Sequence, residues 1–157
     1  MQKVHHVLVQ LVVPRTQGAQ SAGNYPAPDR DIGFALFGTT VAMQAAGGAT
    51  LDATTYLPEG AQLVDVLLDT VTAHTSASAT VAGGTSAAGG TELFSATDVK
   101  TAPRSRPTFT SAQLLAGSAL ARNSGQADRA VYLRMALGTP TSVGLTNVTL
   151  VYVIKAN

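Results

Sequence analysis

Apolar residues recur at every second position from Gln62 to Ala73, and this period of two limits what the chain can fold into. The side expected to face a core carries Val64, Val66, Leu68 and Thr70. The opposite side carries Asp65, Leu67, Asp69 and Val71. Because successive side chains of a β-strand point to opposite faces, we predict a strand with one buried face and one solvated face.

Further segments repeat this alternation or are rich in β-branched residues, and turn-forming residues bound them. They are Val4 to Val13, Phe34 to Ala46, Ala77 to Val81, Ala130 to Leu137 and Leu145 to Lys155. Gly38 interrupts the second segment, as a bulge or turn would. Another segment, Thr50 to Tyr56, leads into the sequence LPEG, whose Pro58 and Gly60 at the second and fourth positions indicate a type I turn.

Helical signals are weak by comparison. Ser111 to Ala121 contains helix formers behind a serine suited to an N-cap, but Gly117 weakens a helix there by roughly 1 kcal/mol relative to alanine. The chain shows no alternation of strands with helices and no fixed-period repeat. With about five to eight strands and at most one short helix, we predict one all-β domain over residues 1–157, a β-sandwich or a jelly-roll-like barrel.

Two segments lack an apolar pattern. The first is an extended arm over residues 14–33, in which Arg15 to Ile32 carries scattered glycines and prolines. Segments of this length are uncommon in compact domains, so the arm is either disordered or ordered by something outside its own fold, with Tyr25 as its natural anchor. The second covers residues 83–90, a glycine-bracketed stretch of Ser, Ala and Thr that is predicted to be a flexible loop.

Composition points to an assembled state. Charged residues make up 12% of the chain, about half the usual share, while hydrophobic residues make up 45%. Small residues replace the missing charge and suit close-packed interfaces. The formal net charge of +1 supplies no long-range field toward nucleic acid or an anionic membrane. No apolar run approaches the roughly eighteen residues of a spanning helix, so we expect neither partner.

The chain contains no cysteine, which excludes disulfides, a thiolate nucleophile and cysteine-ligated zinc. This fits synthesis in a cytoplasm. The opening residues 1–13 lack the small-residue cleavage site of a signal peptide, so we interpret them as mature sequence.

The histidines do not suggest a catalytic or metal site. His5 and His6 would point to opposite faces of the first strand, so they cannot chelate one metal ion together. His74 follows the alternating strand in a turn rich in Thr and Ser, where a solvent-facing side chain is expected rather than a general base.

The acidic residues give no stronger signal. Asp65 and Asp69 share a strand face about 13 Å apart, beyond the ~5 to 9.5 Å of paired glycosidase carboxylates, so we interpret them as outer-face charges. Asp29, Arg30 and Asp31 lack the glycine and distal glutamate of a calcium loop and indicate a self-neutralising cluster. Motifs for nucleotide binding or serine catalysis are missing. We predict a non-enzymatic protein with no catalytic residues, cofactor or metal.

Positive charge gathers in the sequence KTAPRSRP, where prolines flank Lys100, Arg104 and Arg106. Three cations are too few for tight phosphate binding, and no stacking aromatic lies between them. Carboxylates on a neighbouring subunit are a more economical partner. A solvated loop with no specific partner is an equally good interpretation.

The block from Tyr56 to Gly84 resembles a segment of small tailed-phage structural proteins, in which an L-P-x-G-A turn launches a strand of alternating Val and Leu. A turn rich in Thr, Ser and Ala then precedes a second strand that ends in V-x-G. The matching positions are Leu57, Pro58, Gly60, Ala61, Val81, Gly83 and Gly84. The segment Thr97 to Pro107 and the closing sequence TNVTLVYVIKA are also similar, so the resemblance covers about half of the chain.

The resemblance implies a capsid decoration or cement protein, a β-rich and often trimeric component of the outer capsid lattice. It implies no catalytic residues. It implies a β-scaffold that sits across junctions between major capsid subunits, with extended arms that spread contacts to neighbours. The virion exterior is then the expected location, after synthesis in the host cytoplasm. The expected partners are further copies of the chain, as a trimer, and the major capsid protein.

Two sets of residues carry this hypothesis. The expected oligomer interface consists of Val7, Val9, Leu11 and Val13. The expected contacts with the capsid or a neighbouring subunit are Tyr25, Pro26, Asp29, Arg30, Lys100, Arg104 and Arg106. The alternative is a carbohydrate- or receptor-binding module of a spike or tail tip. Sugar sites usually need aromatic platforms, and the chain has no Trp, four Tyr and four Phe.

Overall fold

The computed structural model describes residues 5–9, 36–87, 89–101, 103–114 and 127–154, and these contain nine strands and one short helix. The strands are β1 (His5–Val9), β2 (Leu36–Gln44), β3 (Thr50–Leu57), β4 (Ala61–Thr72), β5 (Ala79–Gly84), β6 (Phe94–Asp98), β7 (Arg104–Ser105), β8 (Arg129–Leu137) and β9 (Leu145–Ile154). The helix is α1 (Ser111–Leu114). The strand count exceeds the predicted range because no predicted segment covers β6 or β7. With two residues, β7 is too short for a sequence pattern.

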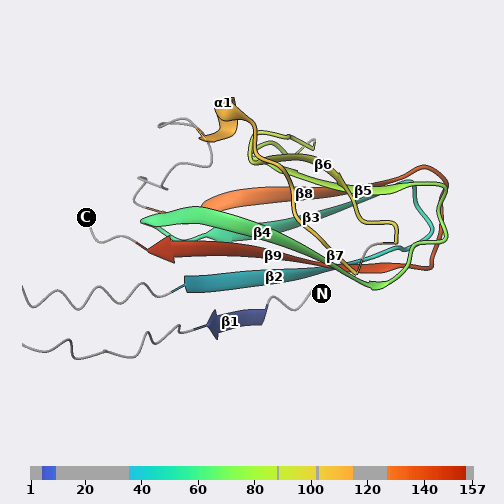
Figure 1. The fold of residues 1–157 in the computed structure, drawn as a ribbon, viewed down its shortest axis with the longest axis horizontal. Helices are drawn as coiled ribbons and strands as arrows, with labels where there is room; N and C mark the ends of the chain where they lie inside the picture. Colours follow the sequence, from blue (N-terminus) through green and yellow to red (C-terminus); the bar gives the residue numbers. More distant parts are fainter. Residues whose placement is uncertain (1–4, 10–35, 88, 102, 115–126, 155–157) are drawn as a thin grey trace, which may run out of the picture.

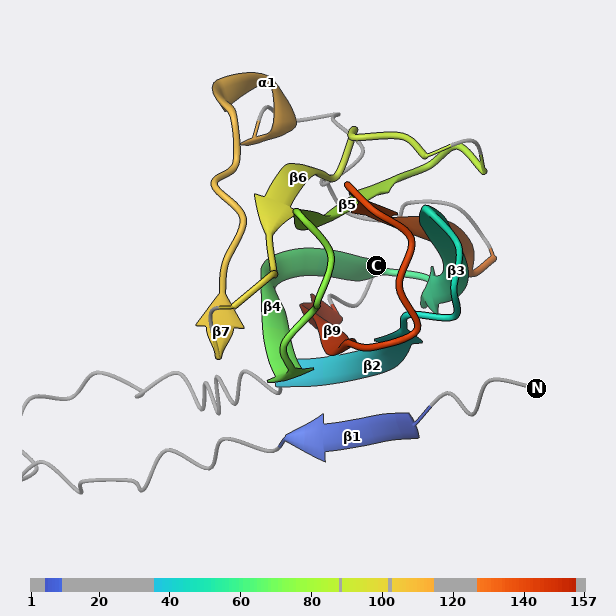
Figure 2. The same ribbon diagram turned by 90° about the vertical axis from the view of Figure 1, so that its right-hand side faces the viewer.

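The strands form two antiparallel sheets that face each other as a sandwich (Figures 1 and 2). The five-stranded sheet has the order β1-β2-β9-β4-β7, and the four-stranded sheet has the order β3-β8-β5-β6. The predicted all-β sandwich is confirmed. In the described residues the sheets do not join into the barrel that we considered as the other possibility. No helix there is long and apolar enough to cross a membrane.

The core fills the space between the sheets, because each strand turns alternate residues inward. On β9, for example, Thr146, Val148, Leu150 and Tyr152 are buried while their neighbours are half-exposed. The largest fully buried side chains are Phe94, Met43, Leu57, Leu68, Leu93, Leu133, Met135 and Leu150. The strands predicted at Ala130 to Leu137 and Leu145 to Lys155 correspond to β8 and β9, except that Lys155 lies outside the described residues.

One predicted core position on β4 is wrong. The pairing of β4 with β9 shifts between Leu63 and Asp65, so Val64 is an extra residue in the strand and remains 50% exposed. A bulge of this kind breaks the alternation locally and restores it afterwards. Val66 and Leu68 are buried as predicted.

Two glycine predictions also need correction. Gly38 neither turns nor bulges β2, because it keeps regular register with Val7 on one side and Val151 on the other. The strand predicted at Ala77 to Val81 begins and ends too early, because Gly83 and Gly84 of the predicted flexible loop over residues 83–90 belong to the strand. It runs from Ala79 to Gly84 as β5, and a Cβ atom at Gly83 would overlap the Phe94 ring. Close packing against an aromatic ring therefore explains a glycine inside a strand.

The turn between β3 and β4 differs from its prediction by one position. The amide of Ala61 donates to the carbonyl of Pro58 at 3.0 Å, so the turn begins at Pro58 rather than Leu57. Gly60, with φ of 72°, then occupies the third position, where a type II turn requires a positive φ. This turn passes the chain from the four-stranded sheet to the five-stranded sheet.

The helix cap is Thr110 and not the predicted Ser111. The Gln113 amide donates to Thr110 Oγ1 at 3.3 Å, and the Thr110 amide donates to Gln113 Oε1 at 2.8 Å. This reciprocal pair is a capping box. Gln113 is buried, and its Nε2 donates to the carbonyl of Thr91 at 2.7 Å. Residues 115–121 of the predicted helix lie outside the described residues.

Candidate interaction face

The candidate interaction face is the side of the five-stranded sheet that points away from the four-stranded sheet, and we call it the outer face. It consists of the residues that alternate with the buried ones on β2, β9 and β4. They are Leu36, Thr40, Ala42, Asn147, Thr149, Val151, Val153, Asp65, Leu67 and Asp69. The residues along β2 and β9 are uncharged, so this part of the face is a stripe of small polar and apolar side chains.

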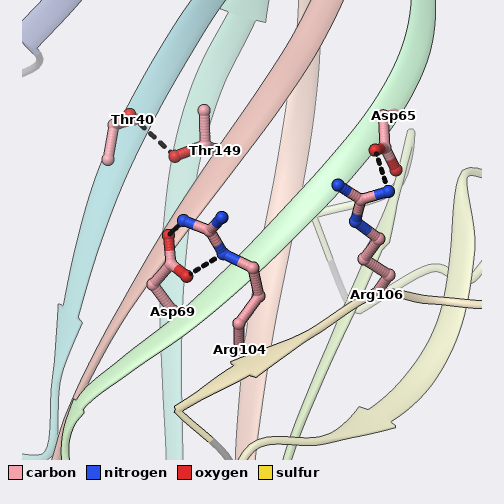
Figure 3. A network of polar contacts seen from close by, with 6 residues as sticks. All are labelled: Thr40, Asp65, Asp69, Arg104, Arg106 and Thr149. Atoms are coloured by element: carbon pink, nitrogen blue, oxygen red, sulfur yellow. Dashed lines mark hydrogen bonds and ion pairs between the residues drawn. The ribbon is translucent and has the colours of Figure 1, made fainter.

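A threonine pair marks the centre of this stripe. Thr40 on β2 and Thr149 on β9 are directly opposite each other, and their hydroxyl oxygens lie 2.9 Å apart (Figure 3). Leu67 on β4 is opposite Thr149 on the other side. Because the two hydroxyls hydrogen-bond each other, the stripe exposes few unsatisfied polar groups around Thr40 and Thr149.

Positive charge reaches the outer face through β7. Arg104 pairs in register with Asp69 on β4, and its guanidinium forms two hydrogen bonds with the carboxylate (Figure 3). The Nε donates to Oδ1 at 2.5 Å and Nη2 donates to Oδ2 at 3.0 Å. The hydrogen bonds to Asp69, followed by its charge, raise the pKa of Arg104. An arginine side chain stays protonated in proteins, so this ion pair persists wherever Asp69 is ionised.

Arg106 makes a second ion pair one step further along the segment. Its Nη1 lies 3.4 Å from Asp65 Oδ2 (Figure 3). From the sequence, we considered carboxylates of a neighbouring subunit as partners for these arginines. In the structure, both arginines pair with carboxylates of their own chain. The side chains of Arg104 and Arg106 remain 57% and 63% exposed, so both guanidiniums can contact a further partner. Exposed pairs of this kind contribute little to folding stability.

Lys100, the third cation of this segment, makes its hydrogen bonds with Ala77, Asp98 and His74. Its Nζ donates to the carbonyl of Ala77 at 3.0 Å, and its amide donates to Asp98 Oδ1 at 2.8 Å. Its own carbonyl accepts the amide hydrogen of His74 at 3.1 Å. Lys100 therefore connects the segment after β6 to the segment after β4.

The predicted solvent-facing position of His74 is wrong, because the residue is only 3% exposed. Its Nε2 lies 2.9 Å from Thr146 Oγ1 on β9, and its imidazole packs so closely on Gly144 that a Cβ atom there would overlap the ring. Burial lowers the pKa of His74. Nothing near His74 in the sequence signals this burial, because Gly144 and Thr146 belong to a segment far along the chain.

The hydrogen bonds around His74 favour one tautomer. Thr70 Oγ1 donates to the carbonyl of Val99 at 2.7 Å and lies 3.4 Å from Thr146 Oγ1. If His74 Nε2 carries the proton, each group donates to the next, from His74 through Thr146 to Thr70 and then to Val99. Nδ1 is buried without a hydrogen-bond partner, which an unprotonated nitrogen tolerates better than an N–H would.

Several predicted residues lie outside the described part of the chain: Leu11, Val13, Tyr25, Pro26, Asp29 and Arg30. Val7 and Val9 belong to β1, at the register positions opposite Gly38 and Leu36. Among the described residues, no cluster of three or more His, Asp or Glu side chains could hold a metal ion. Tyr56 is the exposed aromatic residue there, at 55%, which is little for a sugar-binding platform.

Comparison with known proteins adds one likeness of fold. No family model and no curated protein match the chain. A chain in the solved structure of the cyanophage Pam1 capsid asymmetric unit superposes with a TM-score of 0.53 at 22% sequence identity. The match covers 91% of this chain and 100% of that chain. At this level of identity, the likeness shows that the two chains share a fold along nearly their whole length.

Proposed function

We propose that this chain is a non-enzymatic structural protein of a tailed-phage virion, and specifically a capsid decoration or cement protein. The observation that carries the proposal is the end-to-end fold likeness to a chain of a phage capsid asymmetric unit. A likeness that spans 91% of one chain and all of the other involves the whole architecture, including its two sheets, rather than one shared hairpin.

The outer face supports the same proposal. Along β2 and β9 it presents uncharged side chains such as Thr40, Thr149 and Val151, which can approach another protein without a large desolvation cost. Its charges are confined to the Asp65, Asp69, Arg104 and Arg106 edge. A centre depleted of charge with charged residues at the rim is the usual anatomy of a protein–protein interface.

In the proposed mechanism, copies of the chain assemble as a homotrimer that sits on the capsid exterior, at junctions between major capsid subunits. Val7, Val9, Leu11 and Val13 supply the contacts between copies. Tyr25, Pro26, Asp29 and Arg30 in the arm, with Lys100, Arg104 and Arg106, contact the shell or a neighbouring copy. Individual contacts are weak, and symmetry multiplies them into a stable attachment.

The test uses the chain together with the major capsid protein encoded in the same genome. Shells assembled from that protein are mixed with this chain, sedimented, and analysed for bound copies per shell. We expect saturable binding, and a higher temperature for DNA release from virions that carry the chain. A chain that stays in the supernatant with intact shells at micromolar concentration would rule out the decoration role.

Two variants locate the contact. Deletion of residues 15–32 removes no described strand, and we expect a folded protein that no longer saturates shells. Arg104→Gln with Arg106→Gln should weaken shell binding several-fold. Arg134→Gln is the matched control, because Arg134 makes the same bidentate pair with Asp52 on the four-stranded sheet. Equal loss in both arginine variants would mean that the outer face is not the contact.

A further inference from the structure

Strand β2 has two neighbours of very different kinds. On one side it pairs with β9 along its full length, from Leu36 to Gln44. On the other side it pairs with β1 from Leu36 to Thr40. Figure 2 shows β1 at the margin of the sandwich, beneath β2, and among the described strands β1 has no second sheet neighbour. Among the described strands, the backbone ladder of β1 is therefore made with β2 alone.

The connection between β1 and β2 does not enforce their pairing within one chain. The strands are antiparallel with Val9 opposite Leu36, so the ends that the chain must join are already adjacent. A hairpin loop of about two to five residues would join them. The connection instead consists of residues 10–35, and a segment of this length can span on the order of 80 Å when fully extended. Such a tether allows β1 to reach well beyond its own β2.

We infer that β1 is an exchanged strand: in the assembled protein, β1 of one copy pairs with β2 of a second copy of the chain. Exchange preserves every backbone hydrogen bond of the β1–β2 ladder, and where other contacts already hold the copies together, its remaining cost is the difference in tether entropy. A second copy is the occupant because it carries the same strand in the same register. The inference rests on the self-association that the proposed function includes, and it specifies how the copies are linked.

Cysteine cross-linking tests this inference cleanly, because the natural chain contains no cysteine. Directly opposed residues of antiparallel strands have Cα atoms about 4.5–5.5 Å apart, within the range of a disulfide. Tagged Val9→Cys and untagged Leu36→Cys chains are co-expressed and oxidised mildly at low concentration. We expect a covalent heterodimer on a non-reducing gel. The pair His5→Cys and Thr40→Cys repeats the test at a second register position.

The matched control is Ala42→Cys co-expressed with Asn147→Cys. These residues are opposite each other on β2 and β9, which belong to the interior of one sheet and are not expected to exchange. A heterodimer from the β1–β2 mixtures and none from the control supports exchange. The inference is overturned if neither mixture gives a heterodimer while a Val9→Cys/Leu36→Cys double variant closes a disulfide within one chain. Equal cross-linking in the test and control mixtures also overturns it. Wild-type binding to shells would in that case leave the proposed function standing.

Discussion

The two neighbours of β2 differ in what holds them. β9 lies between β2 and β4, and its inward side chains Val148 and Leu150 are fully buried between the sheets. β1 lies at the edge and pairs with β2 alone among the described strands. Burial keeps β9 in the sandwich of its own chain, because its inward side chains pack in a core formed by distant segments of that chain. A backbone ladder at an edge is less selective, because any strand of suitable register can complete it.

The largest effect is expected at the start of β9. Gly144 has φ of 138° and lies against His74, so Gly144→Ala combines backbone strain with overlap of the imidazole. We expect the free energy of unfolding to fall by roughly 2–6 kcal/mol in urea denaturation. Gly47→Ala is the control, because Gly47 also has a positive φ but a Cβ atom there would have no neighbour within 4 Å. A similar loss in both variants would show that strain, and not the packing on His74, dominates.

The next prediction compares how much β9 and β1 contribute to folding stability. Leu150→Ala opens a cavity in the core, and we expect it to lower the free energy of unfolding by about 2–5 kcal/mol. Deletion of residues 1–9 removes β1 and should change the mass of the assembly, measured by light scattering, more than the urea midpoint of the sandwich. A truncated chain that loses as much folding stability as Leu150→Ala would contradict the comparison.

A smaller effect is expected from Thr146 on β9. Thr146→Val keeps the side-chain shape and removes the hydroxyl next to His74 Nε2, which leaves a buried polar nitrogen without its partner. We expect a loss of about 1–3 kcal/mol in the free energy of unfolding. Thr149→Val on the outer face of the same strand removes a half-exposed hydroxyl and should change stability far less. Equal losses would mean that the His74 hydrogen bonds contribute nothing specific.

The smallest predicted effect is a pH dependence from His74. Burial lowers the pKa of this residue in the folded state below its ordinary value near 6.5, so the unfolded chain binds the proton more readily. Stability is then highest at neutral pH and falls as the pH drops below about 6.5, by at most about 1.4 kcal/mol per pH unit. Once the folded state also takes up the proton, the loss stops growing.

Urea denaturation at pH 7.5 and pH 5.5 checks this pH dependence. His74→Gln should show a smaller fall than the natural chain, and His5 and His6 cancel because both proteins keep them. The hydrogen bonds from Arg134 lower the pKa of Asp52, so that carboxylate loses its contribution only at more acidic pH, outside this window. An identical fall in both proteins would assign the pH dependence to other groups.

The period of two in the sequence was sufficient to locate most strands. The predicted segments at Gln62 to Ala73, Ala130 to Leu137 and Leu145 to Lys155 match β4, β8 and β9 to within one or two residues, apart from the undescribed Lys155. The all-β class followed as well, because alternation and turn residues are local properties of the chain. Asp65 and Asp69 were also correctly placed on the outer face for this reason.

Only the tertiary structure decided how these strands are matched. Val64 is exposed because β4 pairs with β9 through a bulge, and the alternation within β4 cannot reveal a shift that the partner strand imposes. His74 is buried because Gly144 leaves room for its ring. Arg104 binds Asp69 because β7 aligns with β4. Each of these contacts joins segments far apart in the sequence, where register and burial depend on the partner strand rather than on neighbouring residues.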